Sequence, residues 1–208
     1  MVRTAVLVSG GGTNLQAIIA AQLFGEIQNC KLVAVISSTP GAYALDRARA
    51  AGIETSVVDF SMFPTKRTFN TALLEKLKDL DVELVVLAGF MPVLQRSIVK
   101  EFENRVINVH PSLMPAFCGP GRIGLRVHQM VLDQGVKVSG ATVHFVTEEI
   151  ADGPIILQKA VDVQQDDTAK ILQRRIMELG EWDILPRAID LYCRGKLRVE
   201  GRKVIIDE

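Results

Sequence analysis

Short apolar runs alternate with amphipathic stretches along the first half of the chain. Each run is brief and continuous, which is typical of strands in a parallel sheet that is covered on both faces. The stretches between them carry apolar residues at helical spacing and predict helices. The expected strands are residues 5–8, 32–36, 55–58, 84–88 and 106–110, and the expected helices are residues 14–21, 43–51 and 66–80. This alternation predicts a doubly wound, mostly parallel α/β sheet with right-handed crossovers.

The second half of the chain has a different pattern. Residues 138–146 and 154–163 are longer, partly alternating segments joined by a short loop, so they favour an antiparallel portion of the sheet. Residues 168–192 predict one long helix, and residues 197–199 and 204–206 predict a closing hairpin. No repeat, low-complexity segment or linker is visible, so we expect a single domain over residues 1–208.

Composition narrows the classes of protein that fit this pattern. With 208 residues, 48% of them hydrophobic, the chain can bury a sizeable core. Its 24 Lys and Arg balance 24 Asp and Glu, which gives no electrostatic case for nucleic acid or an anionic membrane surface. No apolar stretch approaches the roughly 20 residues of a membrane helix. Cys30, Cys118 and Cys193 are far apart, which predicts reduced thiols in a cytoplasmic protein and no cysteine metal site.

A glycine-rich turn, Ser9 to Asn14, follows the first expected strand and opens the first expected helix. Glycines let the backbone approach a ligand closely, and the free amides at a helix start attract an anion. The turn matches neither a Walker loop nor a complete dinucleotide fingerprint. We therefore expect a site for a mononucleotide or sugar phosphate, with a tight strand-to-helix turn as the simpler alternative.

A second segment, Leu87 to Leu94, ends a buried strand at Gly89 and continues as an apolar loop. Ligands in open α/β sheets bind beyond the carboxyl ends of the strands. Phe90, Met91 and Leu94 can therefore wall a flat heterocycle, although ordinary core packing explains this segment equally well.

The third segment carries the strongest chemical signal, because Asn108 and His110 are two residues apart at a strand end and so point to the same side. An amide and an imidazole placed together can stabilise an oxyanion and transfer a proton. On a later expected strand, His144 is interpreted as a structural or supporting residue. Asp152 lies in a glycine-proline loop, from which a carboxylate can orient His110 and raise its pKa. An ordinary Asp-Gly turn is the simpler interpretation of that loop.

Taken in order, these segments resemble the glycinamide ribonucleotide formyltransferase family, folate-dependent enzymes of purine synthesis. The similarity covers essentially the whole chain, through VLVSGGGTNLQAII, VVLAGFMPVL, INVHPSLMP, VSGATVHFV and GPIILQKAV. INVHPSL is shared with other enzymes of 10-formyltetrahydrofolate, whereas the glycine turn followed by TNLQAII is typical of the ribonucleotide branch. The resemblance implies a Rossmann-like formyltransferase fold that transfers the formyl group of 10-formyltetrahydrofolate, a co-substrate, to the amine of glycinamide ribonucleotide.

The resemblance also implies roles for individual residues. Asn108 and a protonated His110 would be catalytic, with Asp152 as the supporting carboxylate. The ribonucleotide would be held by Gly11, Gly12, Thr13, Asn14 and Glu181. The folate would be held by Lys66, Phe90, Met91, Pro92, Val93, Leu94 and Asn108. We accordingly expect a phosphate-binding half at 1–100, a folate and catalytic half at 101–208, no metal, small-molecule partners only, and a monomer or homodimer.

Two places depart from the family pattern. The family usually has aspartate, any residue, glycine and proline in the loop before the last long strand. Counted back from Gly153, the aspartate position is Ala151, and the carboxylate comes one residue later at Asp152. Residues 117–124 are longer than the shortest form of that loop and are expected to lie near the site as a lid.

Three rival functions remain on the sequence alone. A formyltetrahydrofolate hydrolase would use water as acceptor, and a methionyl-tRNA formyltransferase would need an RNA-binding domain. Relatives of both kinds usually carry an additional domain, for which we expect no room in this chain. A catalytically silent phosphosugar- or folate-binding protein is the third rival; Ala151 favours it, and the retained Asn108 and His110 argue against it.

Overall fold

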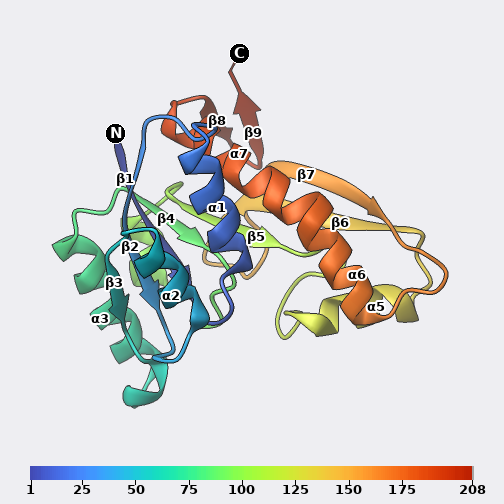
Figure 1. The fold of residues 1–208 in the computed structure, drawn as a ribbon, viewed down its shortest axis with the longest axis horizontal. Helices are drawn as coiled ribbons and strands as arrows, with labels where there is room; N and C mark the ends of the chain where they lie inside the picture. Colours follow the sequence, from blue (N-terminus) through green and yellow to red (C-terminus); the bar gives the residue numbers. More distant parts are fainter. Residues whose placement is uncertain (208) are drawn as a thin grey trace.

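The computed structural model describes residues 1–207 and contains, within that part of the chain, one sheet of nine strands (Figure 1). The strands lie in the order β3-β2-β1-β4-β5-β6-β7-β9-β8. Their bounds are β1 (Val2–Val8), β2 (Cys30–Ser37), β3 (Thr55–Val57), β4 (Leu84–Leu87), β5 (Val106–His110), β6 (Val138–Phe145), β7 (Ile155–Asp162), β8 (Leu197–Glu200) and β9 (Lys203–Ile206). One sheet thus runs through both halves of the chain.

The first five strands are parallel, and the antiparallel portion begins at β6. β6 also pairs antiparallel with β7, while the closing hairpin of β8 and β9 joins the sheet through a parallel contact of β9 with β7. The structure confirms the predicted mostly parallel sheet with an antiparallel C-terminal portion. β4 and β5 therefore end at the same edge of the sheet, where ligands of open α/β folds bind.

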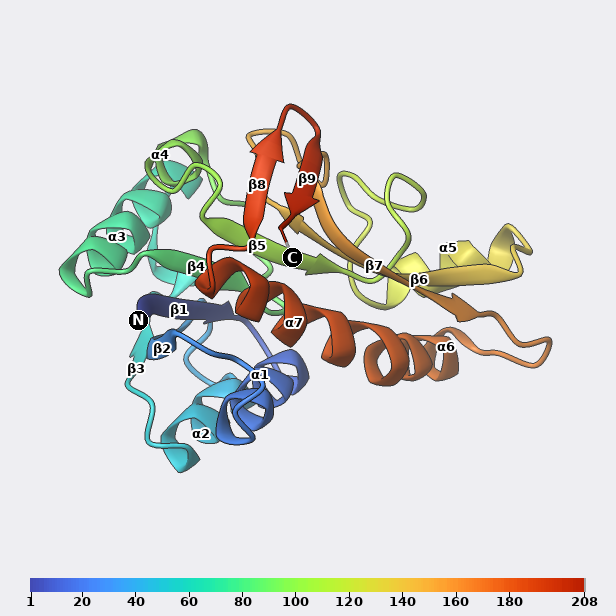
Figure 2. The ribbon, with the colours of Figure 1, turned by 90° about the horizontal axis from the view of Figure 1, so that it is seen from above.

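Helices cover both faces of the sheet (Figure 2). They are α1 (Thr13–Leu23), α2 (Tyr43–Ala50), η1 (Phe60–Met62), α3 (Lys66–Asp79), α4 (Arg96–Glu101), α5 (Leu125–Asp133), α6 (Ala169–Ile176), η2 (Met177–Glu181) and α7 (Trp182–Cys193). Successive residues of a strand point to opposite faces. Leu7 therefore packs in the core under α3 and α4, while its neighbours Val6 and Val8 pack in the core under the remaining α-helices. This two-sided burial explains the continuous apolar runs in the sequence.

The long helix predicted over residues 168–192 is instead three consecutive segments: α6, a π-helical turn at Met177–Glu181, and α7. Gly180 lets this turn approach β6 closely, since a Cβ on it would lie 3.1 Å from the Cβ of Ala141. Pro186, inside α7, lacks the N–H that would continue the helical ladder. The sequence pattern also missed the short elements η1, α4 and α5.

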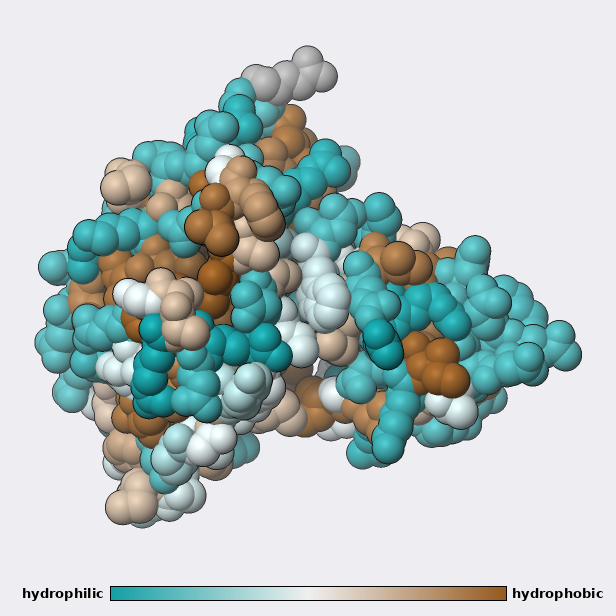
Figure 3. Space-filling view, viewed as in Figure 1, coloured by the Kyte–Doolittle hydropathy of each residue, from teal (hydrophilic) through white to brown (hydrophobic). Residues whose placement is uncertain are grey.

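The surface is hollowed between the part that carries α1 and α2 and the lobe that carries α5 (Figure 3). The start of α1, where the glycine turn leads in, borders this hollow. The fold therefore places the glycine turn and the carboxyl ends of the central strands on neighbouring parts of one surface.

Candidate active site

A pocket of about 140 Å³ lies beyond the carboxyl ends of β4 and β5. One wall is the apolar loop after β4, and the opposite wall is the segment of residues 147–151 between β6 and β7. The lining includes the predicted residues Phe90, Met91, Pro92, Val93, Leu94, Asn108 and His110, together with His144. The pocket therefore draws on both halves of the chain and brings the apolar loop and the strand-end pair together.

Asn108 is held in place by His144, which lies directly opposite it in the β5–β6 register. The Nδ1 of His144 lies 2.8 Å from the carbonyl oxygen of Phe145. Because a carbonyl only accepts, Nδ1 carries the hydrogen and Nε2 is the free acceptor. Nε2 lies 3.1 Å from the Nδ2 of Asn108, so the Asn108 amide donates to it. Burial lowers the pKa of His144 to about 4, which keeps this arrangement neutral.

His110 is buried, with 7% of its surface exposed, and its Nε2 lies 3.2 Å from the carbonyl oxygen of Phe117. Nε2 therefore donates, and Nδ1 is the nitrogen that can accept a proton. Burial lowers the pKa of His110, and the bond to Phe117 opposes this only in part. The expected protonated His110 is thus corrected to a neutral imidazole near pH 7, because no carboxylate of the described residues bonds to it.

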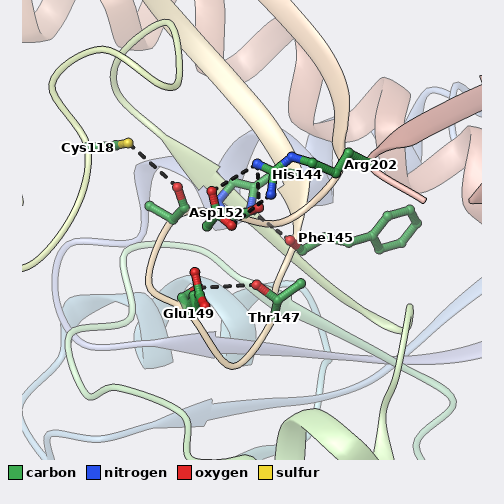
Figure 4. A network of polar contacts seen from close by, with 8 residues as sticks. Cys118, His144, Phe145, Thr147, Glu149, Asp152 and Arg202 are labelled. Carbon is green, nitrogen blue, oxygen red and sulfur yellow. Dashed lines mark hydrogen bonds and ion pairs between the residues drawn. The ribbon is translucent and has the colours of Figure 1, made fainter. Parts of the chain in front are cut away.

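Asp152 does not reach His110 in this structure, contrary to expectation. Its carboxylate faces Arg202, with contacts of 2.8 Å and 2.9 Å to the two guanidinium nitrogens (Figure 4). Hydrogen bonding to Arg202 holds the pKa of Asp152 below its usual range. Ala151, one residue earlier, lines the pocket instead. Gly153 explains the register, since a Cβ on it would lie 1.7 Å from the carbonyl oxygen of Phe145, so this end of the loop is seated directly on β6.

The glycine turn lies beside the π-helical turn. Gly12 has φ of 72° and begins α1 without a side-chain cap, and the first turn of α1 contains no acidic residue. Asn14 donates through Nδ2 to Glu181 at 2.6 Å, although the two residues are 167 positions apart. Glu181 is buried, and this burial raises its pKa. Within the described residues the Oδ1 of Asn14 is buried without a partner, so an unsatisfied acceptor lies at the start of α1.

The structure also places the remaining basic residues near the site, two of which the sequence patterns missed. Lys66 is exposed at the start of α3 and is not among the residues that line the pocket. Arg122, on the 117–124 loop, does line it. Arg47 of α2 lies beside the glycine turn and donates to the carbonyl oxygen of Gly11 at 2.9 Å. Isolated arginines on a helix or loop carry no periodic signal, so only the tertiary structure identifies them.

Neither a metal cluster nor a membrane span is found in residues 1–207. No three His, Cys, Asp or Glu side chains in this part of the chain are grouped as metal ligands. No helix in it is long and apolar enough to cross a bilayer.

Comparison with known proteins finds formyl transferases and longer purine biosynthetic proteins. A family model described as formyl transferase matches residues 2–189. The phosphoribosylglycinamide formyltransferase of Haemophilus influenzae is 36% identical over 207 residues, covering 100% of this chain and 94% of the relative. The crystal structure of glycinamide ribonucleotide transformylase 1 from Symbiobacterium toebii superposes with a TM-score of 0.94 and 45% identity, covering 100% of this chain and 95% of that one. The trifunctional purine biosynthetic protein adenosine-3 of Bos taurus is 40% identical over 197 residues, but this chain spans only 19% of its length.

Proposed function

We propose that this chain, which belongs to the formyl transferase family, transfers the formyl group of 10-formyltetrahydrofolate to the amine of glycinamide ribonucleotide. The observation that carries the proposal is the pairing of Asn108 and His110 in one pocket, with the Asn108 amide oriented by a neutral His144. An amide donor and a proton acceptor at one end of an apolar pocket suit acyl transfer between two bound substrates.

The pocket's lining fits a folate in chemical character. Phe90, Met91 and Leu94 offer an apolar wall for a flat ring system, and the polar groups of Asn108 and His110 lie at the end of β5. Placing the formyl group next to these two side chains would leave the rest of the folate along the apolar loop. Arg122 supplies a positive charge in the lining, which suits a ligand that carries carboxylates.

In this mechanism the amine nitrogen attacks the formyl carbon and forms a tetrahedral oxyanion. The Asn108 amide donates one N–H to His144 and has a second N–H for the oxyanion. Neutral His110 accepts the amine proton at Nδ1 while Nε2–H stays bonded to Phe117, and it returns a proton to the departing N10 as the intermediate collapses. The products are tetrahydrofolate and the formylated ribonucleotide, and His110 is neutral again after it has returned the proton.

The acceptor substrate is assigned to the glycine turn and the π-helical turn. The uncapped amides that begin α1 would bind the phosphate, with Thr13 adding a hydroxyl. The bare Oδ1 of Asn14 and the buried carboxyl of Glu181 would bind ribose hydroxyls. Gly11 and Gly12 let the phosphate approach the backbone.

We further assign the protein to the cytoplasm, as a monomer or homodimer that binds small molecules and no nucleic acid or membrane. The free cysteines Cys30, Cys118 and Cys193 suit a reducing compartment. Oxyanion stabilisation by Asn108 and proton transfer by His110 are assigned to these side chains alone, with no metal in the proposed mechanism. Sedimentation analysis with and without substrates tests the oligomeric state.

A catalytically silent binding protein is the second candidate, because Asp152 is engaged by Arg202 and not by His110. One assay separates the alternatives: the protein is incubated with 10-formyltetrahydrofolate, with and without glycinamide ribonucleotide, and tetrahydrofolate release is followed. Release that requires the ribonucleotide supports the transferase. Release without it identifies a hydrolase, and no release under either condition identifies the silent binder.

A further inference from the structure

The pocket wall formed by residues 147–151 is a thin partition. Its outer side faces a second hollow, which is lined by Thr147, Glu148 and Glu149 as well as by Asp152 and Arg202. The first three of these also line the pocket itself. A segment with open space on both sides gains little rigidity from packing, so its position depends on a few polar contacts.

Those contacts come from three separate parts of the chain. Glu148 pairs with Arg96 of α4 at 3.0 Å. The carbonyl oxygen of Ala151 accepts from the Sγ of Cys118, on the 117–124 loop, at 3.5 Å. Arg202, at the turn between β8 and β9, binds the carboxylate of Asp152 from the outside (Figure 4). The wall is therefore held by an ion pair at Glu148, near its start, and by contacts at Ala151 and Asp152, at its end.

The backbone of Ala151 turns Asp152 towards Arg202. Ala151 has φ of 53°, in the left-handed region that a non-glycine residue adopts at a cost. In this conformation Ala151 lines the pocket, and Asp152 lines the outer hollow. Gly153, the residue after Asp152, is seated on Phe145, so the turn at Ala151 and Asp152 is held by the Arg202 contact together with the Cys118 bond.

The contact between Arg202 and Asp152 is suited to fixing the backbone at Asp152. Its guanidinium makes one bond to each carboxylate oxygen of Asp152 and a third, at 3.2 Å, to the Asp152 carbonyl oxygen. A bidentate pair fixes orientation as well as distance, which a single exposed ion pair does not. The hairpin that carries Arg202 thus supports the loop before β7 from the C-terminal end of the chain.

We propose that Arg202 is a positioning residue for the formyl donor: it clamps Asp152 so that residues 147–151 form the folate-facing wall of the pocket. This inference rests on the proposed function for the identity of the donor. The residues of the glycine turn are not among those that line the pocket, so the clamp acts on the folate and not on the ribonucleotide.

The test uses three variants of the clamp: Arg202→Gln, Asp152→Asn and the double variant that combines them. The control is Arg198→Gln, on the same hairpin, where Arg198 pairs with Glu200 and Asp207. Isothermal titration calorimetry with tetrahydrofolate and with glycinamide ribonucleotide gives two dissociation constants that need no turnover. We expect each single variant to weaken tetrahydrofolate binding by about three- to tenfold, the range that a well-aligned surface ion pair supports. The double variant is expected to match the single variants, while ribonucleotide binding, the melting temperature and the Arg198→Gln control stay unchanged.

Different outcomes overturn the clamp. Unchanged tetrahydrofolate binding in Arg202→Gln would refute it, and equal weakening of both ligands would show a merely structural role. A large loss of kcat in Asp152→Asn alone, with folate binding intact, would make Asp152 a catalytic carboxylate instead. If the wild-type protein binds tetrahydrofolate but catalyses no formyl transfer, the proposed function fails while the clamp remains measurable by the same titrations.

Discussion

The Asn108 amide donates to the Nε2 of His144 across the β5–β6 pair at 3.1 Å, and this bond defines which way the amide faces. The opposite nitrogen of His144 is tied to the Phe145 carbonyl oxygen, so the imidazole can present only an acceptor to Asn108. His144, which the sequence suggested was a structural or supporting residue, therefore determines which way the Asn108 amide faces.

Replacing His144 with Phe should lower kcat by about tenfold to a hundredfold, because the Asn108 amide loses the partner that orients it towards the oxyanion. The KM values for both substrates should change little, since His144 is almost fully buried and its loss leaves the apolar wall intact. Steady-state kinetics measures both parameters. His144→Gln, which keeps a neutral acceptor, is the matched control and should recover part of the rate; equal loss in both variants would contradict the orienting role.

Replacing His110 with Ala should reduce kcat by about two to four orders of magnitude, the usual contribution of a positioned proton-transfer group. Substrate binding should be largely retained. Near-normal turnover in this variant would refute the mechanism.

The pH dependence of the wild-type enzyme tests the protonation state of His110. Because burial lowers the pKa of His110, the neutral, proton-accepting form should dominate at pH 7. The kcat should therefore be level around neutral pH and should fall on the acid side, at a pH below the ordinary 6.5 of histidine. A profile that rises as the pH falls below neutral would show that the imidazolium is the active form.

Acid stability should depend on His128, which is fully buried with both ring nitrogens unpartnered within the described residues. Its pKa is lowered to about 4 by burial and by His110. The unfolded chain thus binds a proton at higher pH than the folded protein does. As the pH is lowered from about 6.5 to 4, the free energy of unfolding therefore decreases, by about 3 kcal/mol at pH 4. His128→Leu should reduce this dependence in urea titrations at several pH values without abolishing it, because burial also lowers the pKa of His144 to about 4. An unchanged slope would exclude His128 as its source.

Glu181→Ala should raise the KM for glycinamide ribonucleotide by about tenfold or more, because the Asn14 side chain loses its 2.6 Å partner and its orientation. The dissociation constant for tetrahydrofolate should be unchanged. Glu181→Gln retains an acceptor oxygen of the same shape and should have the smaller effect. A rise in both constants would indicate disruption of the turn between α6 and α7 and not loss of a substrate contact.

The sequence by itself determined the sheet, because burial on both faces imposes continuous apolar runs that short-range patterns reveal. The strand that carries Asn108 and His110, expected at residues 106–110, is observed as Val106–His110. The strand period alone also put Asn108 and His110 on one side, and both line the pocket. The glycine turn likewise opens α1 as expected.

Only the tertiary structure decided which charged groups meet, because such contacts join residues far apart in sequence. Asp152 pairs with Arg202, 50 positions away, since Gly153 can sit on Phe145 and the backbone turns at Ala151. Arg122 enters the pocket lining, and this could not be predicted because a loop has no period that sets the direction of its side chains. The neutrality of His110 was also undetermined by sequence, because it depends on burial and on the absence of a carboxylate bonded to it among residues 1–207.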